Sequence, residues 1–155
     1  MITIVQPDAA EDIETVRTLF REYESWLGMD LCFQGFEQEL ADLPGKYSEP
    51  DGRLFLASEN GTALGCVALR KLGRGACEMK RLYLRPEARG RGLGNILIEK
   101  IIEAARSIGY QKLRLDTHPP KMGKAVSLYE SHGFRPIPPY YDNPHSDVLF
   151  MELSL

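Results

Sequence analysis

Residues 78–94 read EMKRLYLRPEARGRGLG, and this stretch decides the fold. Its first part belongs to an apolar and aromatic run, residues 76–84, which is typical of a strand. Pro86 then ends the strand, because proline cannot donate a hydrogen bond to a central ladder. From Leu93 to Ile108 apolar residues recur at helical spacing. The stretch therefore predicts a strand, a glycine-rich loop and a helix in direct succession.

The loop, Arg89–Gly94, predicts an anion-binding site. Glycine lets the backbone come close to a ligand, and the free N–H groups at the start of a helix attract phosphate. Arg89 and Arg91 add positive charge. The glycine spacing is G-x-G-x-G, which matches neither a Walker loop nor a dinucleotide fingerprint. The expected ligand is therefore a phosphate compound that is bound by a different motif.

Two motifs resemble the GNAT superfamily of N-acetyltransferases. The pattern Arg89-x-x-Gly92-x-Gly94, after a strand that contains Glu78, resembles the acetyl-CoA-binding motif of this superfamily. Residues 125–134, AVSLYESHGF, resemble its A-x-x-L-Y-x-x-x-G-F segment. The motifs follow one another in the family's order. The resemblance covers most of the chain and is strongest over residues 76–134.

The order of predicted elements agrees with an α+β fold. Strands are expected at residues 2–5, 54–57, 63–69, 76–84, 112–117 and 148–153, and helices at about 13–27, 36–43, 93–108 and 124–132. Asp8 and Glu11 read as a capping box for the first helix, and Asn60-Gly61 as a two-residue hairpin turn. Pro119 and Pro120 are expected to end the strand at residues 112–117, and residues 136–144 to form a stiff loop. The resemblance implies the acyl-CoA N-acyltransferase fold, a mixed α/β/α domain over residues 1–155 with a central, mostly antiparallel, splayed sheet and helices on both faces.

Within residues 76–84 the side-chain alternation slips by one residue. Cys77 and Met79 are apolar, and the apolar positions continue at Leu82 and Leu84. Because side chains keep to one face with a period of two, the slip predicts a β-bulge. The resemblance implies the same feature: the sheet splays here, and the pantetheine arm of the cofactor enters the gap.

Composition indicates one globular domain. The 155 residues are 43% hydrophobic and 26% charged, which suffices for a buried core. No apolar run is long enough to cross a bilayer, and the N-terminus lacks a signal-peptide pattern, so we expect no membrane partner and a cytoplasmic location. Cys32, Cys66 and Cys77 show no metal-ligand spacing. They are expected to be reduced thiols, and no metal is expected.

The net charge of −3 is unevenly distributed along the chain. Residues 1–60 hold 13 acidic and 4 basic side chains, whereas residues 61–155 hold 9 acidic and 15 basic ones. The basic part contains the glycine loop, as a polyanionic cofactor requires. The acidic part either meets a cationic acceptor or only keeps the surface soluble. No basic stripe interleaved with aromatic residues occurs, so nucleic acid is not an expected partner.

The resemblance implies acetyl-CoA as the cosubstrate. It assigns cofactor contacts to the residues that match the two motifs, namely Leu82, Tyr83, Leu84, Arg89, Gly90, Arg91, Gly92, Leu93, Gly94, Ser127 and Tyr129. The loop N–H groups are expected to bind the pyrophosphate. A backbone N–H near Leu82, freed by the bulge, is expected to hold the thioester carbonyl.

Two residues are expected to act in catalysis. Only about one lysine-like amine in a thousand is neutral at pH 7, so a base is useful. Glu78 matches the position of the family's catalytic glutamate, which acts directly or through water; the alternative is a strand carboxylate paired with Lys80 or Arg81. Tyr129 matches the tyrosine that protonates the departing CoA thiolate, and the alternative is a core aromatic residue.

The implied reaction is transfer of an acetyl group to a primary amine, of a small molecule or an amino-acid derivative, by direct attack on the thioester. Candidate acceptor contacts are Tyr23, Trp26, Tyr140 and Tyr141, with core packing as the alternative. An open groove along residues 26–33 would favour a protein N-terminus or lysine as the acceptor. A non-catalytic acyl-CoA sensor is a further alternative, and a homodimer is compatible with the resemblance.

Overall fold

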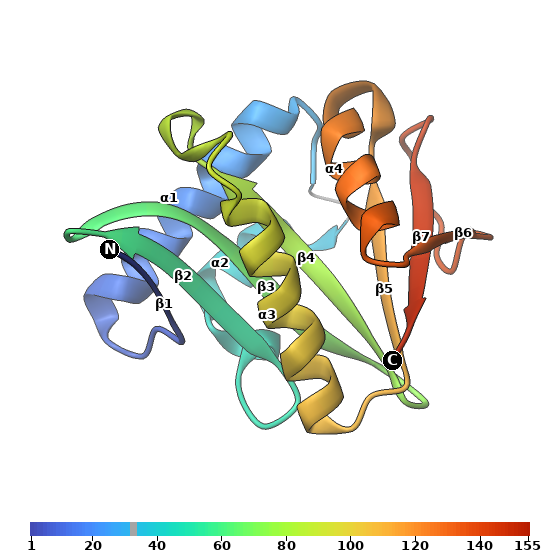
Figure 1. The fold of residues 1–155 in the computed structure, drawn as a ribbon, viewed down its shortest axis with the longest axis horizontal. Helices are drawn as coiled ribbons and strands as arrows, with labels where there is room; N and C mark the ends of the chain where they lie inside the picture. Colours follow the sequence, from blue (N-terminus) through green and yellow to red (C-terminus); the bar gives the residue numbers. More distant parts are fainter. Residues whose placement is uncertain (32–33) are drawn as a thin grey trace.

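The computed structural model describes residues 1–31 and 34–155 and shows one sheet with helices on both faces (Figure 1). Among these residues, seven strands pair in the order β1-β2-β3-β4-β5-β7-β6. Their bounds are β1 Ile2–Val5, β2 Arg53–Glu59, β3 Thr62–Gly73, β4 Ala76–Leu84, β5 Lys112–Thr117, β6 Arg135–Ile137 and β7 Leu149–Ser154. β4 and β5 pair in parallel, and the other neighbours are antiparallel. The predicted fold class is confirmed.

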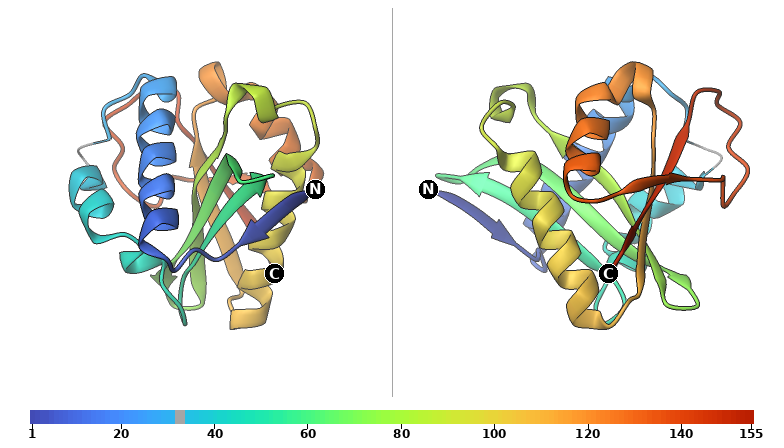
Figure 2. Two further views of the ribbon diagram at one scale, coloured as in Figure 1. Left: turned by 90° about the vertical axis from the view of Figure 1, so that its left-hand side faces the viewer. Right: turned by 45° about the vertical axis from the view of Figure 1, so that its right-hand side comes forward.

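The helices divide between the two faces of the sheet (Figure 2). α1 Ala10–Leu27 and α2 Phe36–Asp42 cover one face, and α3 Leu93–Ile108 and α4 Pro119–Ser131 cover the other. Short 3₁₀ turns occur at Gly45–Tyr47 and Pro86–Ala88. Cys32 and the end of the apolar connection at residues 26–33 lie outside the described residues.

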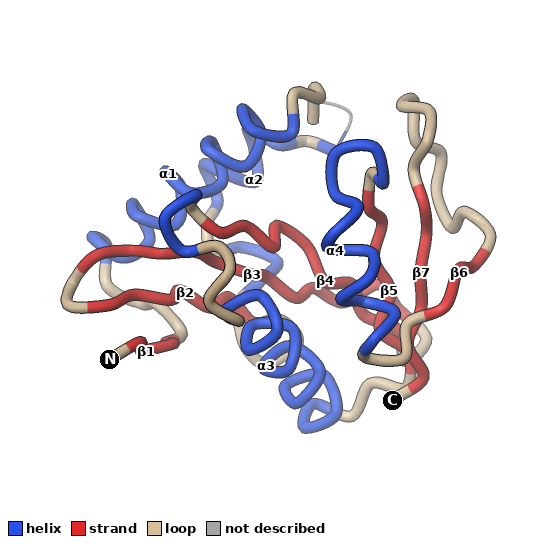
Figure 3. Tube along the Cα trace, turned by 45° about the horizontal axis from the view of Figure 1, so that its top comes forward, coloured by secondary structure: helices blue, strands red, loops and turns tan. Residues whose placement is uncertain are grey.

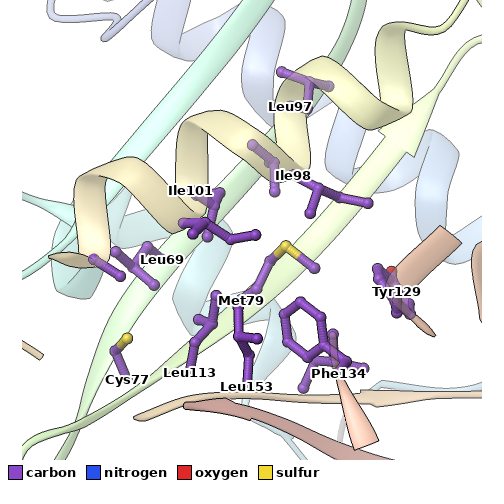
Figure 4. Packing of buried hydrophobic residues seen from close by; sticks show 14 of the residues in the cluster. Leu69, Cys77, Met79, Leu97, Ile98, Ile101, Leu113, Tyr129, Phe134 and Leu153 are labelled. Carbon is purple, nitrogen blue, oxygen red and sulfur yellow. The ribbon is translucent and has the colours of Figure 1, made fainter. Parts of the chain in front are cut away.

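Each face of the sheet has its own apolar core, since alternate strand residues point to opposite faces. On the α3 side, Leu97, Ile98 and Ile101 pack with Leu69, Met79 and Leu113 (Figure 4). On the α1 side the largest fully buried side chains include Phe20, Phe36 and Tyr47. The sheet is therefore fixed from both sides, which holds the ends of β4 and β5 in place.

The bulge predicted in β4 is confirmed. Lys80 pairs with Ala68 but Tyr83 pairs with Cys66, so two residues of β4 stand opposite one residue of β3. Arg81, the first residue of this bulge, has a φ of +60°. Leu82 therefore reaches the α3 side of the sheet, whereas Tyr83 packs in the α1-side core.

Other turn predictions hold as well. Asn60 and Gly61 have φ values of +52° and +80°, as a type I′ hairpin requires. α1 ends at Gly28, which adopts the left-handed conformation at φ +71°.

The capping-box prediction was wrong. The N-cap of α1 is Ala9, with no side-chain hydrogen bond, so Asp8 lies one residue too early to cap the helix. The acidic residues Glu11 and Asp12 lie in the first turn instead, where they interact favourably with the helix dipole.

Two predictions near the C-terminus were also wrong. β5 ends at Thr117, before the two prolines, as predicted, but Pro119 and Pro120 already begin α4, earlier than the start predicted near residue 124, because proline fits the first turn of a helix. The helix is kinked at Met122, whose φ and ψ of −122° and 34° are not helical. Part of the expected loop forms the short edge strand β6, in which Pro136 is tolerated because it lies at the edge of the sheet.

Candidate active site

The site is built where β4 and β5 part. These strands pair only between Ala76–Glu78 and Lys112–Arg114. Beyond this point β4 follows β3 and β5 follows β7, and the two diverge (Figure 3). Neighbouring parallel strands that separate at their carboxyl ends commonly leave a ligand site between them. The splay that the resemblance implied is therefore present.

A narrow cavity of about 30 Å³ lies in this divergence and is called the splay cavity below. Its wall comes from four elements: Tyr23 of α1, Met79, Lys80, Arg81 and Leu82 of β4, Leu115 and Asp116 of β5, and Met122 and Tyr129 of α4. Tyr129 is 5% exposed, and burial raises the pKa of its hydroxyl well above the ordinary value. The hydroxyl is therefore protonated at neutral pH and able to donate.

The glycine loop joins β4 to α3. Gly90 and Gly92 have φ values of +77° and +78°, in the left-handed region that favours glycine, and Gly92 is the N-cap of α3. The first N–H groups of a helix have no intrahelical acceptor, so they are free to bind an anion. At Gly94, an added Cβ would lie 3.4 Å from Leu128 of α4 and 3.7 Å from Leu84. The loop therefore packs closely beside the splay cavity's walls.

Basic side chains surround this loop. The Arg89 guanidinium lies 5.2 Å from the ring centroid of Trp26, and Lys121 Nζ lies 5.5 Å from the same ring. Arg91 forms a half-exposed ion pair with Glu59 at 2.9 Å. Trp26 thus lies between two cations next to the glycine loop, a position suited to a polyanionic ligand.

Glu78 is only 1% exposed and is held by several donors. Its carboxylate accepts hydrogen bonds from Arg70 Nε at 2.8 Å and from the Tyr140 hydroxyl at 2.5 Å, and Lys80 Nζ lies 3.8 Å away. Burial raises the pKa of Glu78, but the charges of Lys80 and Arg70 and the two hydrogen bonds outweigh burial and leave the pKa lowered. Glu78 lines neither of the two cavities at the divergence.

Tyr141, the residue after Tyr140, binds a second carboxylate, that of Asp116. The Tyr141 hydroxyl donates a short hydrogen bond to Asp116 Oδ2, and Asn143 Nδ2 donates to the same hydroxyl at 2.9 Å. Burial raises the pKa of Asp116, although Tyr141 and Lys80 act to lower it. Glu78, which is buried, and Asp116, which is half-buried, are thus two carboxylates on adjacent strands with opposite pKa shifts.

A second, smaller cavity of about 20 Å³ adjoins the first and is called the acceptor-side cavity below. It extends to the end of α1 and to the segment between β6 and β7, with Leu27, Gln34 and Asn143 in its wall. The two cavities share Tyr23, Arg81, Asp116 and Met122. These four side chains mark the junction between the cavities.

Arg81 lies at this junction, and Lys80, the residue before the bulge, lines the splay cavity beside it. Arg81 forms a buried two-point bond with Glu39 of α2, at 3.0 Å and 2.8 Å. Lys80 Nζ donates to Gln34 Oε1 at 2.9 Å, and burial lowers the pKa of Lys80 to about 8. Arg81 is therefore neutralised, whereas Lys80 is easily deprotonated.

Comparison with known proteins identifies the family. Residues 13–134 match the Acetyltransferase (GNAT) family. The chain belongs to this family. It is 44% identical to an uncharacterized N-acetyltransferase of Schizosaccharomyces pombe, over 99% of this chain and 95% of that one. It is 34% identical to the IAA acetyltransferase of Azospirillum brasilense, over 99% of this chain and 98% of that one.

The fold is also similar to those of solved GNAT structures. The PaiA N-acetyltransferase of Thermoplasma acidophilum, in complex with coenzyme A, superposes with a TM-score of 0.76. That likeness covers 100% of this chain and 99% of the other, at 22% identity. The protein is thus an acyltransferase of the GNAT family, whose members use acetyl-CoA.

The residues of this GNAT chain fit such a cosubstrate. The left-handed glycines and the start of α3 offer backbone N–H groups, and the basic cluster around Trp26 lies next to them. Leu82 and Tyr129 line the splay cavity, and Leu84 lies beside Gly94. Tyr83 points to the other face, where its hydroxyl donates to Glu22 at 3.3 Å, and Ser127 is exposed on α4. The loop therefore lies close to the splay cavity.

The predicted acceptor contacts separate into two groups. Tyr23 lines both cavities, and Tyr140 and Tyr141 bind the two carboxylates. Trp26 lines neither cavity and lies beside Arg89. The role of Trp26 as an acceptor contact stays a prediction, and its surroundings favour the cosubstrate.

Sequence reasoning missed Asp116, Lys80 and Gln34. One signal for Asp116 was available: it alternates with Leu113 and Leu115 at the end of a strand next to the bulged one. Gln34 had no such signal, because it reaches Lys80 across 46 residues of sequence.

Membrane-spanning helices and metal-ligand clusters are the last two features of the described residues. Within residues 1–31 and 34–155, no helix is both long and apolar enough to cross a bilayer. In the same ranges, no three His, Cys, Asp or Glu side chains gather so that they could hold a metal ion.

Proposed function

We propose that this GNAT enzyme transfers the acetyl group of acetyl-CoA directly to a primary amine, of a small molecule or an amino-acid derivative. The observation that carries the proposal is the splay cavity, in which a buried, protonated Tyr129 faces the bulge at Arg81–Leu82. A thioester placed there would lie between a proton donor and a strand whose backbone pairing is interrupted.

Each part of the chain has a separate task in this proposal. The N–H groups of residues 90–94 bind the pyrophosphate. The N–H near Leu82 holds the thioester carbonyl and stabilises the negative charge that develops on its oxygen. Tyr129 donates its proton to the departing sulfur. Its raised pKa keeps the proton in place until the thiolate forms.

Glu78 remains the base that the family resemblance suggests, but its contacts favour an indirect role. Both carboxylate oxygens are engaged, by Arg70 and by Tyr140, and the side chain reaches neither cavity. A proton could reach it only through the Tyr140 hydroxyl or a water molecule. We propose that Glu78 chiefly positions Tyr140 and Lys80.

A small acceptor is favoured over a protein acceptor. Leu27 and Leu31 of the apolar connection are buried in the α1-side core and line the acceptor-side cavity. An extended peptide would require an open groove there. The acceptor of the Azospirillum relative, IAA, is not carried over, because 34% identity does not preserve acceptor choice.

The test is acetyl transfer with wild-type protein and with Tyr129→Phe. Purified protein is mixed with acetyl-CoA and one amine of a panel: phenethylamine, L-lysine, spermidine and a peptide with an N-terminal alanine. Free thiol and acetylated amine are measured together. We expect transfer to at least one amine, and a fall in kcat of about 10²-fold or more in Tyr129→Phe, since a general acid contributes on that order.

Tyr110→Phe is the matched control. Its hydroxyl donates to the Asp51 carbonyl at 2.6 Å and lines neither cavity, so kcat should be unchanged. Acetyl-CoA affinity should stay the same in both variants. A Tyr129→Phe protein with full turnover would contradict the role of Tyr129, and thiol release without any acetylated amine would contradict the transferase proposal.

A further inference from the structure

Two consecutive tyrosines hold two carboxylates that differ in their access to the cavities. Tyr140 donates to Glu78 on β4, and Tyr141 donates to Asp116 on β5. Glu78 lines neither cavity, whereas Asp116 lines both. Asp116 is therefore the carboxylate at the junction of the acceptor-side cavity and the splay cavity, where Tyr23, Arg81 and Met122 also lie.

The charges around the junction single out the same residue. Glu39 is paired with Arg81 and Glu78 with Arg70, each at 2.8 Å. Asp116 forms no ion pair with any residue in the ranges 1–31 and 34–155, and in these ranges only Oδ2 accepts a hydrogen bond. Oδ1 is left for a ligand. Lys80, which lines the splay cavity with Asp116, directs its Nζ to Gln34.

The electrostatic environment of Asp116 is unfavourable for folding. Burial raises its pKa and the neighbouring carboxylate of Glu78 raises it further, whereas the hydrogen bond from Tyr141 and the charges of Lys80 and Arg81 only partly offset these effects. At neutral pH the ionised side chain therefore costs stability. A half-buried carboxylate next to a cavity, without an ion-pair partner among the described residues, is typical of a functional group.

We propose that Asp116 is the residue that receives the ammonium group of the acceptor and takes up its proton. The inference rests on the proposed acetyl transfer and adds a direct proton acceptor to it. Asp116 removes one proton from the ammonium, and the freed nitrogen lone pair forms the N–C bond with the thioester carbon. The C–S bond then breaks, and Tyr129 gives its proton to the sulfur. A second nitrogen proton returns to Tyr129, and Asp116 releases its proton to water, so that protons balance.

The acceptor-side cavity indicates the kind of amine. Leu27, Met29 and Met122 give it an apolar wall, and His118 contributes a buried Nδ1 that has no hydrogen-bond partner among the described residues. The acceptor class is therefore a primary amine, cationic in solution, with an apolar body next to the amino group.

The test uses two amines of similar shape. Phenethylamine is mostly cationic at pH 8, whereas 2,2-difluoro-2-phenylethylamine has a much larger neutral fraction because fluorine withdraws electrons. For Asp116→Asn we expect kcat/KM to fall by about 10²–10⁴-fold with phenethylamine, and much less with the fluorinated amine. Acetyl-CoA affinity should be unchanged, and the midpoint of thermal unfolding should equal or exceed that of the wild type.

Two further variants distinguish a loss of proton transfer at Asp116 from a general loss of structure at the site. Asp142→Asn removes the exposed carboxylate next to Tyr141 and should leave both rates unchanged. Glu78→Gln should lower both rates by the same factor and lower the unfolding midpoint. The role of Asp116 is overturned if Asp116→Asn keeps full turnover, or if it loses the same factor with both amines.

The outcomes also distinguish this inference from the proposed function. Wild-type protein that acetylates other amines of the panel but neither phenethylamine nor its analogue contradicts the acceptor class. Wild-type protein that acetylates no amine at all contradicts the proposed function itself.

Discussion

At the scale of single residues, Glu78 is held by more groups than catalysis alone would require. Arg70, Lys80 and Tyr140 all reach its carboxylate. Its pKa is lowered, so the folded state binds a proton there less readily than the unfolded chain does. The ionised form therefore stabilises the fold above the ordinary glutamate value of 4.5, and this contribution is lost as the pH falls below it.

Glu78→Gln should lower the free energy of unfolding at pH 7 by about 1–3 kcal/mol, because Arg70 and Lys80 lose a charged partner. The difference from wild type should shrink as the pH falls from 5 toward 3. Urea unfolding at several pH values measures both effects. Glu103→Gln, an exposed position on α3, should change little. A difference that is independent of pH would show that the charge of Glu78 does not stabilise the fold.

At the scale of elements, α2 is joined to the bulge of β4 by one buried ion pair. Glu39 and Arg81 have side chains that are each 3% exposed, and they share two hydrogen bonds. Arg81 also carries the positive φ of the bulge. The pair therefore fixes the strand at the point where the splay cavity opens.

Glu39→Gln should cost about 3–5 kcal/mol of unfolding free energy, because it leaves Arg81 buried without a counter-charge. Glu37→Gln on the same helix is the matched control. Its ion pair with Arg21 is exposed, at 65% for the glutamate, so its loss should cost at most about 1 kcal/mol. Chemical denaturation of both variants gives the comparison, and equal stabilities for the two would contradict the structural importance of the buried pair.

Secondary elements could be predicted from the sequence where local signals were strong. The bounds of β4, its bulge, the Asn60-Gly61 turn and the end of α1 at Gly28 all follow from side-chain period or backbone preference. The start of α4 could not be placed, because proline both breaks a helix and begins one. β6 was missed because three residues carry too little periodicity.

At the scale of the whole molecule, the cosubstrate side of the site could be predicted and the acceptor side could not. The glycine loop and Tyr129 lie in two contiguous motifs of the chain. Asp116 acquires its environment only when β5 meets Tyr141, and Lys80 only when β4 meets Gln34. Such contacts depend on tertiary packing, which no local pattern of this chain records.

The most direct test of the account is calorimetric titration of the purified protein with acetyl-CoA, with NADH and ATP as controls. The glycine loop and the splay cavity together predict saturable binding of one acetyl-CoA per chain. NADH and ATP should bind far more weakly, since they share the phosphates but lack the pantetheine arm. Absence of acetyl-CoA binding, or equal affinity for all three compounds, would contradict the assignment of the site.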